Sequence, residues 1–201
     1  MDVTDADAVA ALADAAEAAF GGIGVWINNA CTCVAGSYHD APLELHRTTI
    51  EVNLLGAISG AYAVLPIFMR QNRGTLINVV SMAAWVPYPF AASYTASKFG
   101  LRQELVGIPD IHVCGVFPAV IDTPIIEHGA NYAGHAVEPP PFLYDPEDVA
   151  ETIVGVALIP RDEVAVGWPI RLHAVPSSVS SAPLLQRSAR KPNQCLAPTA
   201  A

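Results

Sequence analysis

Two residues on a predicted helix, Tyr94 and Lys98, are the first candidates for chemistry in this sequence. Side chains at positions i and i+4 leave a helix on one face, so the phenol and the ammonium can approach a common point. An ordinary tyrosine has a pKa near ~10, and a neighbouring positive charge stabilises the phenolate and lowers that value. The pair therefore predicts a proton donor or acceptor, although the same spacing also occurs on helices with no catalytic role.

Two polar residues could complete such a site. Ser81 ends a predicted strand directly before the helix that carries Tyr94, and its hydroxyl can donate to a substrate oxygen. Asn53 lies inside the preceding predicted helix, where asparagine is unfavourable because its amide competes with the backbone. Asn53 is thus either a tolerated polar residue or a functional one.

The positions of these residues are set by predicted helices and strands that alternate along the chain. Helical periodicity predicts helices at 9–20, 42–69, 91–106 and 146–158. Short runs of β-branched and apolar residues predict strands at 23–28, 75–81, 111–117 and 163–167. The first of these strands is expected to be buried on both faces. The alternation predicts an α/β domain with a parallel sheet.

The ends of the predicted strands indicate where a ligand would bind. In such sheets, ligands bind at the carboxyl ends of the strands. Three strands end in small or polar groups, at Asn28-Asn29-Ala30, at Ser81 and at Pro118-Ala119. Each group alone is explained by a turn, but together they predict a site at one edge of the sheet.

The composition excludes several classes of protein. The chain has 201 residues with 52% hydrophobic and 14% charged, which fits one folded domain. A net charge of −9 argues against a nucleic-acid partner. The apolar stretch 54–69 contains Pro66 and is short for a bilayer span, so we expect a buried helix and no membrane insertion. The acidic first residues do not resemble a signal peptide, and a cytoplasmic location is the default expectation.

The cysteines and histidines give no metal-ligand pattern. Cys31, Cys33, Cys114 and Cys195 are not spaced as zinc ligands, and we expect reduced thiols and no metal site. After Pro176 the sequence is rich in Ser, Ala and Pro. We therefore expect one domain over residues 1–175 and a flexible tail over 176–201.

Together, these residues resemble the short-chain dehydrogenase/reductase family. The resemblance covers residues 2–167 and implies a Rossmann-like, doubly wound parallel sheet. Six motifs carry it, in the order found in the family: DVTD at 2–5, NNA at 28–30, VNLLG at 52–56, VVSMAA at 79–84, YTASK at 94–98 and FPAVIDTP at 117–124.

The resemblance implies hydride transfer between the nicotinamide of NAD or NADP and a small-molecule carbonyl or secondary alcohol. It makes Tyr94 the acid or base, and Ser81 the donor to the carbonyl oxygen. Lys98 would lower the pKa of Tyr94 and hold the nicotinamide ribose, and Asn53 would hold a water that relays protons. The implied cofactor-binding residues are Asp2, Val3, Asn29, Ala30, Tyr94, Lys98, Pro118, Ala119, Val120 and Thr123.

The sequence departs from the family at its start. The family begins with a strand, a T-G-x-x-x-G-x-G turn and two further strands, which have no counterpart here. The glycines at 21–24 precede a strand, so they cannot place phosphate at a helix N-terminus. The choice between NAD and NADP is therefore unreadable, and the strand at 23–28 is expected to be an unpaired edge.

Smaller departures leave two hypotheses open. Cys31 and Ala119 replace common glycines, and we interpret both changes as harmless. The helix from Ala91 is about two turns shorter than usual in the family, which argues against a homo-oligomer without excluding one. The first hypothesis is a working NAD(P)-dependent oxidoreductase, and the alternative is a non-catalytic truncated remnant or interaction module. Substrate and reaction direction are not readable from these residues.

Overall fold

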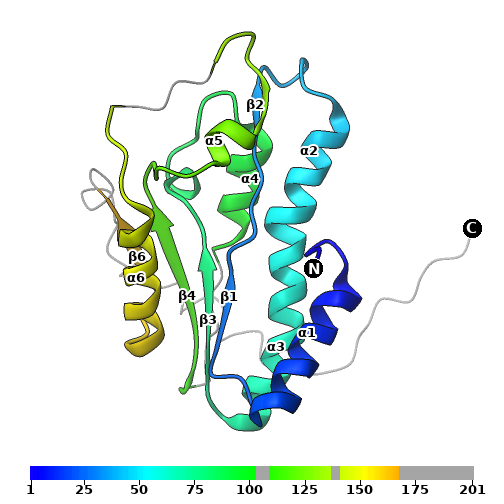
Figure 1. Ribbon diagram of the computed structural model, residues 1–201, viewed down its shortest axis with the longest axis vertical. Helices are drawn as coiled ribbons and strands as arrows, with labels where there is room; N and C mark the ends of the chain where they lie inside the picture. The colour runs from blue at the N-terminus through cyan, green and yellow to red at the C-terminus, as the bar shows by residue number, and fades with distance from the viewer. Residues whose placement is uncertain (103–108, 137–140, 168–201) are drawn as a thin grey trace, which may run out of the picture.

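A parallel sheet of four strands forms the centre of the protein. The computed structural model describes residues 1–102, 109–136 and 141–167. The strands follow the order β1-β3-β4-β6 and are all parallel (Figure 1). They span β1 Val25–Asn28, β3 Gly74–Val79, β4 Ile111–Pro118 and β6 Glu163–Val166. The predicted α/β fold with a parallel sheet is confirmed. The predicted domain end at 175 and the tail at 176–201 lie outside the described residues. The helix predicted over 91–106 ends early, at Gly100, with Leu101 and Arg102 outside it.

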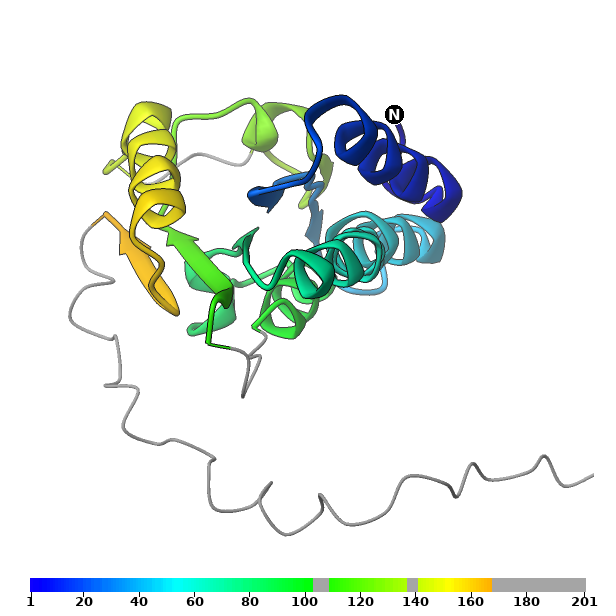
Figure 2. The ribbon, with the colours of Figure 1, turned by 90° about the horizontal axis from the view of Figure 1, so that it is seen from below.

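Helices cover both faces of this sheet, as Figure 2 shows from the end of the strands. They are α1 Ala6–Phe20, α2 Leu43–Ile50, α3 Gly56–Gln71, α4 Ala92–Gly100 and α6 Pro146–Leu158. Neighbouring residues of a strand point to opposite faces, and in β3 these are Leu76 and Ile77. Leu76 packs with Val64 and Phe68 of α3, whereas Ile77 packs with Val156 of α6. The sheet is therefore doubly wound.

One long helical segment carries the predicted site residue Asn53. A π-helical turn, η1 Glu51–Leu55, joins α2 to α3 and contains Asn53. The whole segment, Leu43–Gln71, is long and apolar enough to cross a membrane by length and composition alone. Its residues Val64, Ile67 and Phe68 are buried in the core with Leu76 of β3. A core helix passes the same test. The prediction of a buried helix holds for one face only, because Ile58, Tyr62 and Met69 on the same segment are exposed.

Strand β1 lies at the edge of the sheet. Gly21 ends α1 in the left-handed conformation, with φ of 73°, and donates its N–H to the Glu17 carbonyl. Among the described residues, β1 pairs only with β3, which confirms the predicted edge. The prediction that this strand is buried on both faces is wrong, because Val25 and Ile27 are 37% and 46% exposed. Only the opposite face, which carries Trp26, packs into the core.

Two short strands lie beyond the carboxyl ends of the sheet. They are β2 Val34–Gly36 and β5 Ala130–Tyr132, which pair in parallel, and the short helix α5 Ile125–His128 precedes β5 (Figure 1). The sequence patterns predict no helix or strand at these residues. Strands of three residues are too short for a period-two pattern, so the pattern could not reveal them.

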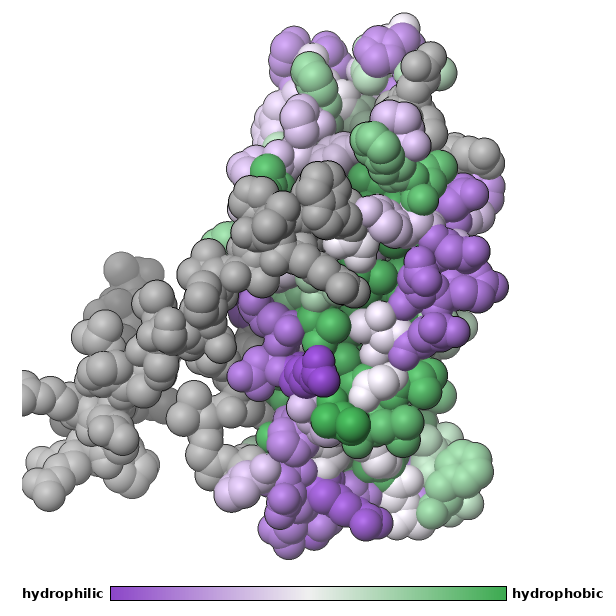
Figure 3. All heavy atoms as spheres, turned by 90° about the vertical axis from the view of Figure 1, so that its left-hand side faces the viewer, coloured by the Kyte–Doolittle hydropathy of each residue, from purple (hydrophilic) through white to green (hydrophobic). Residues whose placement is uncertain are grey.

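Helix α6 covers β4 and β6. Asp145 caps it by accepting a hydrogen bond from the Glu147 N–H at 3.2 Å. Its Val156 packs against Val116 of β4, whereas Val154 and Leu158 are exposed. Apolar side chains accordingly mix with polar ones on this side of the molecule (Figure 3).

Candidate active site

A cavity of about 550 Å³ opens at the carboxyl ends of β1, β3 and β4. Ser81 reaches it from the end of β3, and Tyr94 and Lys98 reach it from α4. The segment after β4 forms another wall. Of the residues predicted for the site, the cavity is lined by Asn29, Ala30, Ser81, Tyr94, Lys98, Pro118, Ala119, Val120 and Thr123.

Lys98 is a buried cation at the base of this cavity. Its side chain is 2% exposed, and its ammonium donates to the Val79 carbonyl at 2.8 Å. Burial lowers the pKa of Lys98, since leaving water disfavours the charged form. The Nζ atom lies 5.8 Å from the centre of the Tyr94 ring. An ammonium has three donors, so Lys98 can bind further acceptors in the cavity.

Tyr94 is held in its protonated form. Burial has the largest influence and raises its pKa, and the neighbouring Cys31 acts in the same direction. A hydrogen bond from Ser81 lowers the pKa but does not reverse the balance. The expectation that Lys98 lowers the pKa of Tyr94 is therefore wrong for this structure. The physical reason is that desolvation of the phenol has the largest influence on its pKa and that Cys31 and Cys33 raise the pKa further.

Ser81 is fixed by the turn that it begins. Its Oγ accepts from the Ala83 N–H at 3.2 Å and caps the 3-10 turn η2, Met82–Ala84. Because this acceptor bond uses an oxygen lone pair, the hydroxyl proton remains available to a partner in the cavity. Ser81 and Tyr94 can thus both donate to one substrate oxygen.

The side chain of Asn53 is hydrogen-bonded to the segment that follows β1. Its Oδ1 accepts from the Thr32 N–H at 2.8 Å, and its Nδ2 donates to the Thr32 carbonyl at 2.9 Å and to Ser97 Oγ at 3.1 Å. The side-chain amide is therefore occupied by protein groups. Sequence reasoning missed Thr32 and Ser97, because neither partner is recognisable from spacing.

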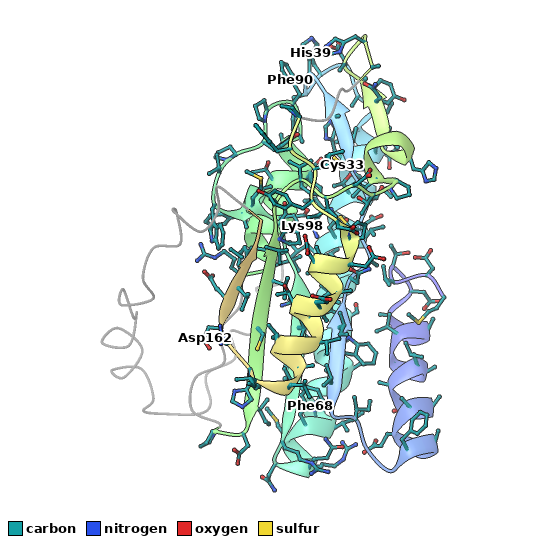
Figure 4. The ribbon with its side chains drawn as sticks, turned by 60° about the vertical axis from the view of Figure 1, so that its left-hand side comes forward. Cys33, His39, Phe68, Phe90, Lys98 and Asp162 are labelled. Atoms are coloured by element: carbon teal, nitrogen blue, oxygen red, sulfur yellow. The ribbon has the colours of Figure 1, made fainter. Side chains whose placement is uncertain are left out.

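Two cysteines enter the cavity, and sequence reasoning missed their importance. Cys31 and Cys33 both line it, and Cys33 and Lys98 lie near each other beyond the ends of the strands (Figure 4). Burial raises the pKa of the Cys33 thiol to about 11. Both side chains belong to an extended segment, where residues i and i+2 share a face. The spacing of Cys31 and Cys33, two residues apart and shortly after β1, was the signal in the sequence that could have placed both in the site.

Of the two remaining predicted cofactor residues, Val3 lies at a second, smaller hollow and Asp2 does not. Val3 lines a groove of about 290 Å³, which shares Asn29, Ala30 and Val79 with the large cavity. Asp2 accepts from the Thr4 N–H and hydroxyl, both at 2.9 Å, and the backbone bond is the main cause of its lowered pKa. Asp2 lines neither hollow.

The described part of the chain contains no group of three or more His, Cys, Asp or Glu side chains that could hold a metal ion. Cys31, Cys33 and Cys114 are free thiols. Cys195 lies outside the described residues.

Comparison with known sequences agrees with this geometry. A family profile described as short chain dehydrogenase matches residues 1–130. The 3beta-hydroxysteroid dehydrogenase 1 of Eggerthella lenta is 32% identical over 168 residues, which cover 78% of this chain and 64% of that protein. The trans-4-hydroxycyclohexanecarboxylate dehydrogenase of Sinomonas cyclohexanicum is 34% identical over 131 residues, covering 62% and 50%. The chain thus spans half to two thirds of the length of these two relatives.

Solved structures share the fold. A gluconate 5-dehydrogenase from Burkholderia cenocepacia, in complex with NADP and tartrate, superposes with a TM-score of 0.69 at 19% identity, covering 83% of this chain and 71% of that one. An alcohol dehydrogenase from Thermococcus sibiricus, complexed with 5-hydroxy-NADP, gives 0.68 at 22% identity, covering 83% and 72%. The family profile matches residues 1–130, which is more than half of the 201-residue chain. This chain therefore belongs to the short-chain dehydrogenase family.

Proposed function

We propose that this chain carries the catalytic centre of an NAD(P)-dependent oxidoreductase acting on a carbonyl compound or a secondary alcohol. The observation that carries the proposal is the convergence of Ser81, Tyr94 and Lys98 on one cavity at the carboxyl ends of the strands. The relatives named above are dehydrogenases of a hydroxysteroid and of a hydroxycyclohexanecarboxylate, which supports the same class of substrate.

The residues around the cavity fit a nicotinamide cofactor. The buried ammonium of Lys98 has donors for ribose hydroxyls, and Thr123 and the backbone after Pro118 are polar groups for a carboxamide. We assign the other half of a dinucleotide to the adjoining groove beside Asn29 and Ala30. No residue described here distinguishes NAD from NADP.

Each side chain has a definite task in this proposal. The cofactor, when bound, supplies or accepts the hydride. In the reducing direction, Tyr94 donates its proton to the substrate oxygen as that oxygen gains negative charge. Its raised pKa keeps the phenol protonated at neutral pH, which suits a donor. Ser81 donates a hydrogen bond to the same oxygen, and Lys98 adds positive charge nearby.

Asn53 is a positioning residue in this account. Its three side-chain hydrogen bonds fix the backbone of Thr32 and the side chain of Ser97. Thr32 lies between the two cysteines that line the cavity, and Ser97 lies next to Lys98 on α4. We therefore assign Asn53 the alignment of these two walls.

Tyr88 provides a matched control for testing Tyr94, because both tyrosines line the cavity and only Tyr94 contacts Ser81. We expect Tyr94→Phe to slow hydride transfer by about 10²–10⁴-fold, as for loss of a general acid. Tyr88→Phe is expected to retain most of the activity. The rates are followed by nicotinamide absorbance with secondary alcohols and the matching ketones.

Two results would contradict this proposal. Equal rates for Tyr94→Phe and Tyr88→Phe would exclude Tyr94 as the acid. A folded chain that neither binds NADH or NADPH nor turns over any substrate would favour the non-catalytic alternative.

A further inference from the structure

We propose that the substrate of this site is an uncharged, apolar ketone or alcohol, and that the cavity rejects substrates that carry a carboxylate. The inference names the class of substrate for the proposed function, and for the reaction it rests on that function. Its physical basis is the polarity and charge of the cavity wall. These properties act on binding alone and can therefore be tested without turnover.

Apolar side chains form the cavity wall next to Ser81 and along the segment that follows β4. Met82 lines the cavity directly after Ser81, and Ile121 and Ile125 line it between β4 and α5. All three residues are half-buried, so part of their apolar surface stays open to a ligand in the cavity. Covering that surface with the carbon skeleton of a substrate removes it from water and favours binding.

The polar side chains of the same cavity offer little to an anion. Among the described residues that line it, Lys98 is the one charged side chain. Its ammonium is buried and donates to the Val79 carbonyl at 2.8 Å, and its other donors are those proposed for the nicotinamide ribose. The amide of Asn131, on the wall beyond α5, donates to the His135 carbonyl at 2.8 Å and accepts from the Ala133 N–H at 2.9 Å.

A carboxylate in this cavity would lose its water without gaining a cation. Burying an unpaired charge is unfavourable, so an acidic substrate would enter only after it takes up a proton. A carboxyl group with a pKa near ~4.3 is protonated in about one molecule in 500 at neutral pH. An acid should therefore react about 500 times more slowly than a neutral analogue of the same shape.

The experiment compares 4-oxocyclohexanecarboxylate with its methyl ester, two ketones that share one ring. Each gains a hydride at carbon from NADH or NADPH and a proton at oxygen from Tyr94, and nicotinamide absorbance reports the rate. We expect kcat/KM for the ester to exceed that for the acid by about 500-fold at pH 7, and the ratio to fall about tenfold for each pH unit below. Both ketones meet the same protein, so its own titration cancels in the ratio. Equal kcat/KM values, or a ratio that is the same at pH 7 and pH 6, would overturn the proposal.

Two lysine variants test where the substrate lies. Ile125→Lys adds a cation to the apolar wall, whereas Val154→Lys adds the same charge on α6 at a side chain that is 58% exposed and does not line the cavity. We expect Ile125→Lys to lower the ester-to-acid ratio at pH 7 by at least about tenfold, because a nearby cation stabilises the carboxylate. Val154→Lys should leave the ratio unchanged, and the melting temperature reports that both variants fold. Equal ratios in the two folded variants would overturn the assignment of the substrate to this wall.

Direct binding separates this inference from the proposed function. Ligand-observed NMR measures the ester and the acid on the natural chain at pH 7, with NADH or NADPH present where either binds. Binding of the ester and none of the acid at the same concentration would support the uncharged, apolar site. Equal binding of both compounds, or no binding of the ester, would overturn it. Absence of cofactor binding and of turnover would defeat the proposed function, while selective binding of the ester would still support the character of the cavity.

Discussion

Lys98 combines two properties that oppose each other, an ionisable head group and near-complete burial. Its single protein carbonyl partner, Val79, satisfies one donor of the ammonium. Burying such a group lowers the stability of the fold. Buried ionisable groups are therefore often found where a functional site needs them. The cavity that it faces explains why a cation is kept at this place.

The lowered pKa of Lys98 predicts how stability changes with pH. The folded pKa lies below the unfolded value near ~10.4, so between the two the unfolded chain binds more protons. The contribution of Lys98 is therefore complete above the unfolded pKa and is lost as pH falls through the folded pKa. We expect the free energy of unfolding of the natural chain, relative to Lys98→Met, to rise with pH between the lowered folded pKa of Lys98 and its unfolded value near ~10.4. Urea unfolding of both chains measures this difference, and a difference independent of pH would contradict the assignment.

Asn53 gives a second prediction about a single side chain. Asn53→Ala leaves the half-buried N–H and carbonyl of Thr32 without their side-chain partner, which should cost about 1–3 kcal/mol of unfolding free energy. Ser97→Ala removes only one of the hydrogen bonds of Asn53 and should cost about 1 kcal/mol. Urea unfolding compares the two variants. Equal losses would mean that the contacts with Thr32 do not hold the segment.

Helix α3 packs closely against β1 at Gly60. A Cβ atom at this position would lie 2.7 Å from the indole nitrogen of Trp26 and would also overlap Asn28. Asn28 in turn donates to the Ala57 carbonyl of α3 and to Asn78 of β3, at 3.1 and 2.9 Å. The glycine thus permits the contact that joins this helix to the strand preceding the cavity.

Gly60 and Gly155 form a matched pair for testing this contact, since both lie inside helices. Gly60→Ala should destabilise the protein by about 1–3 kcal/mol, because the added carbon overlaps packed groups. Nothing lies within 4 Å of a Cβ at Gly155 in α6, so Gly155→Ala should stabilise by about 0.5–1 kcal/mol through helix propensity. Thermal unfolding gives both signs. The same sign for both variants would contradict the packing of α3.

The elements show where prediction from sequence succeeds and where it stops. Strand β3 was predictable from its apolar run and the start of helix α4 from its helical periodicity, whereas the end of α4 at Gly100 was not. The exposed face of β1 was not predictable, since an apolar run does not reveal that a strand lies at an edge. The raised pKa of Tyr94 was not predictable either. Desolvation of its hydroxyl depends on side chains that surround it from segments distant in sequence, such as Cys31.

In the molecule as a whole, the four-stranded sheet has two edge strands in the part that the structure describes, β1 and β6. Along β1, the backbone groups facing away from β3 are available, and Ile27 on its open face is 46% exposed. Such an edge favours pairing with another chain. Self-association through β1 is therefore the property that the assembled fold predicts.

Charge on β1 should reduce this association. We expect Ile27→Lys to lower the concentration-dependent light scattering of the folded chain, because a charged side chain on an edge strand opposes pairing. Phe20→Lys is the control, since Phe20 is 84% exposed but ends a helix whose backbone is already bonded. An equal decrease in both variants would indicate general repulsion in place of edge pairing.

The measurement that tests the central claim most directly is titration of the folded chain with NADH and NADPH, followed by nicotinamide fluorescence and thermal stability. A ligand that binds the folded state raises its stability. The account predicts saturable binding of at least one cofactor, weakened by Lys98→Met and retained by Tyr88→Phe. No binding by a folded chain, or binding that Lys98→Met leaves unchanged, would contradict the claim that this cavity is a nicotinamide site.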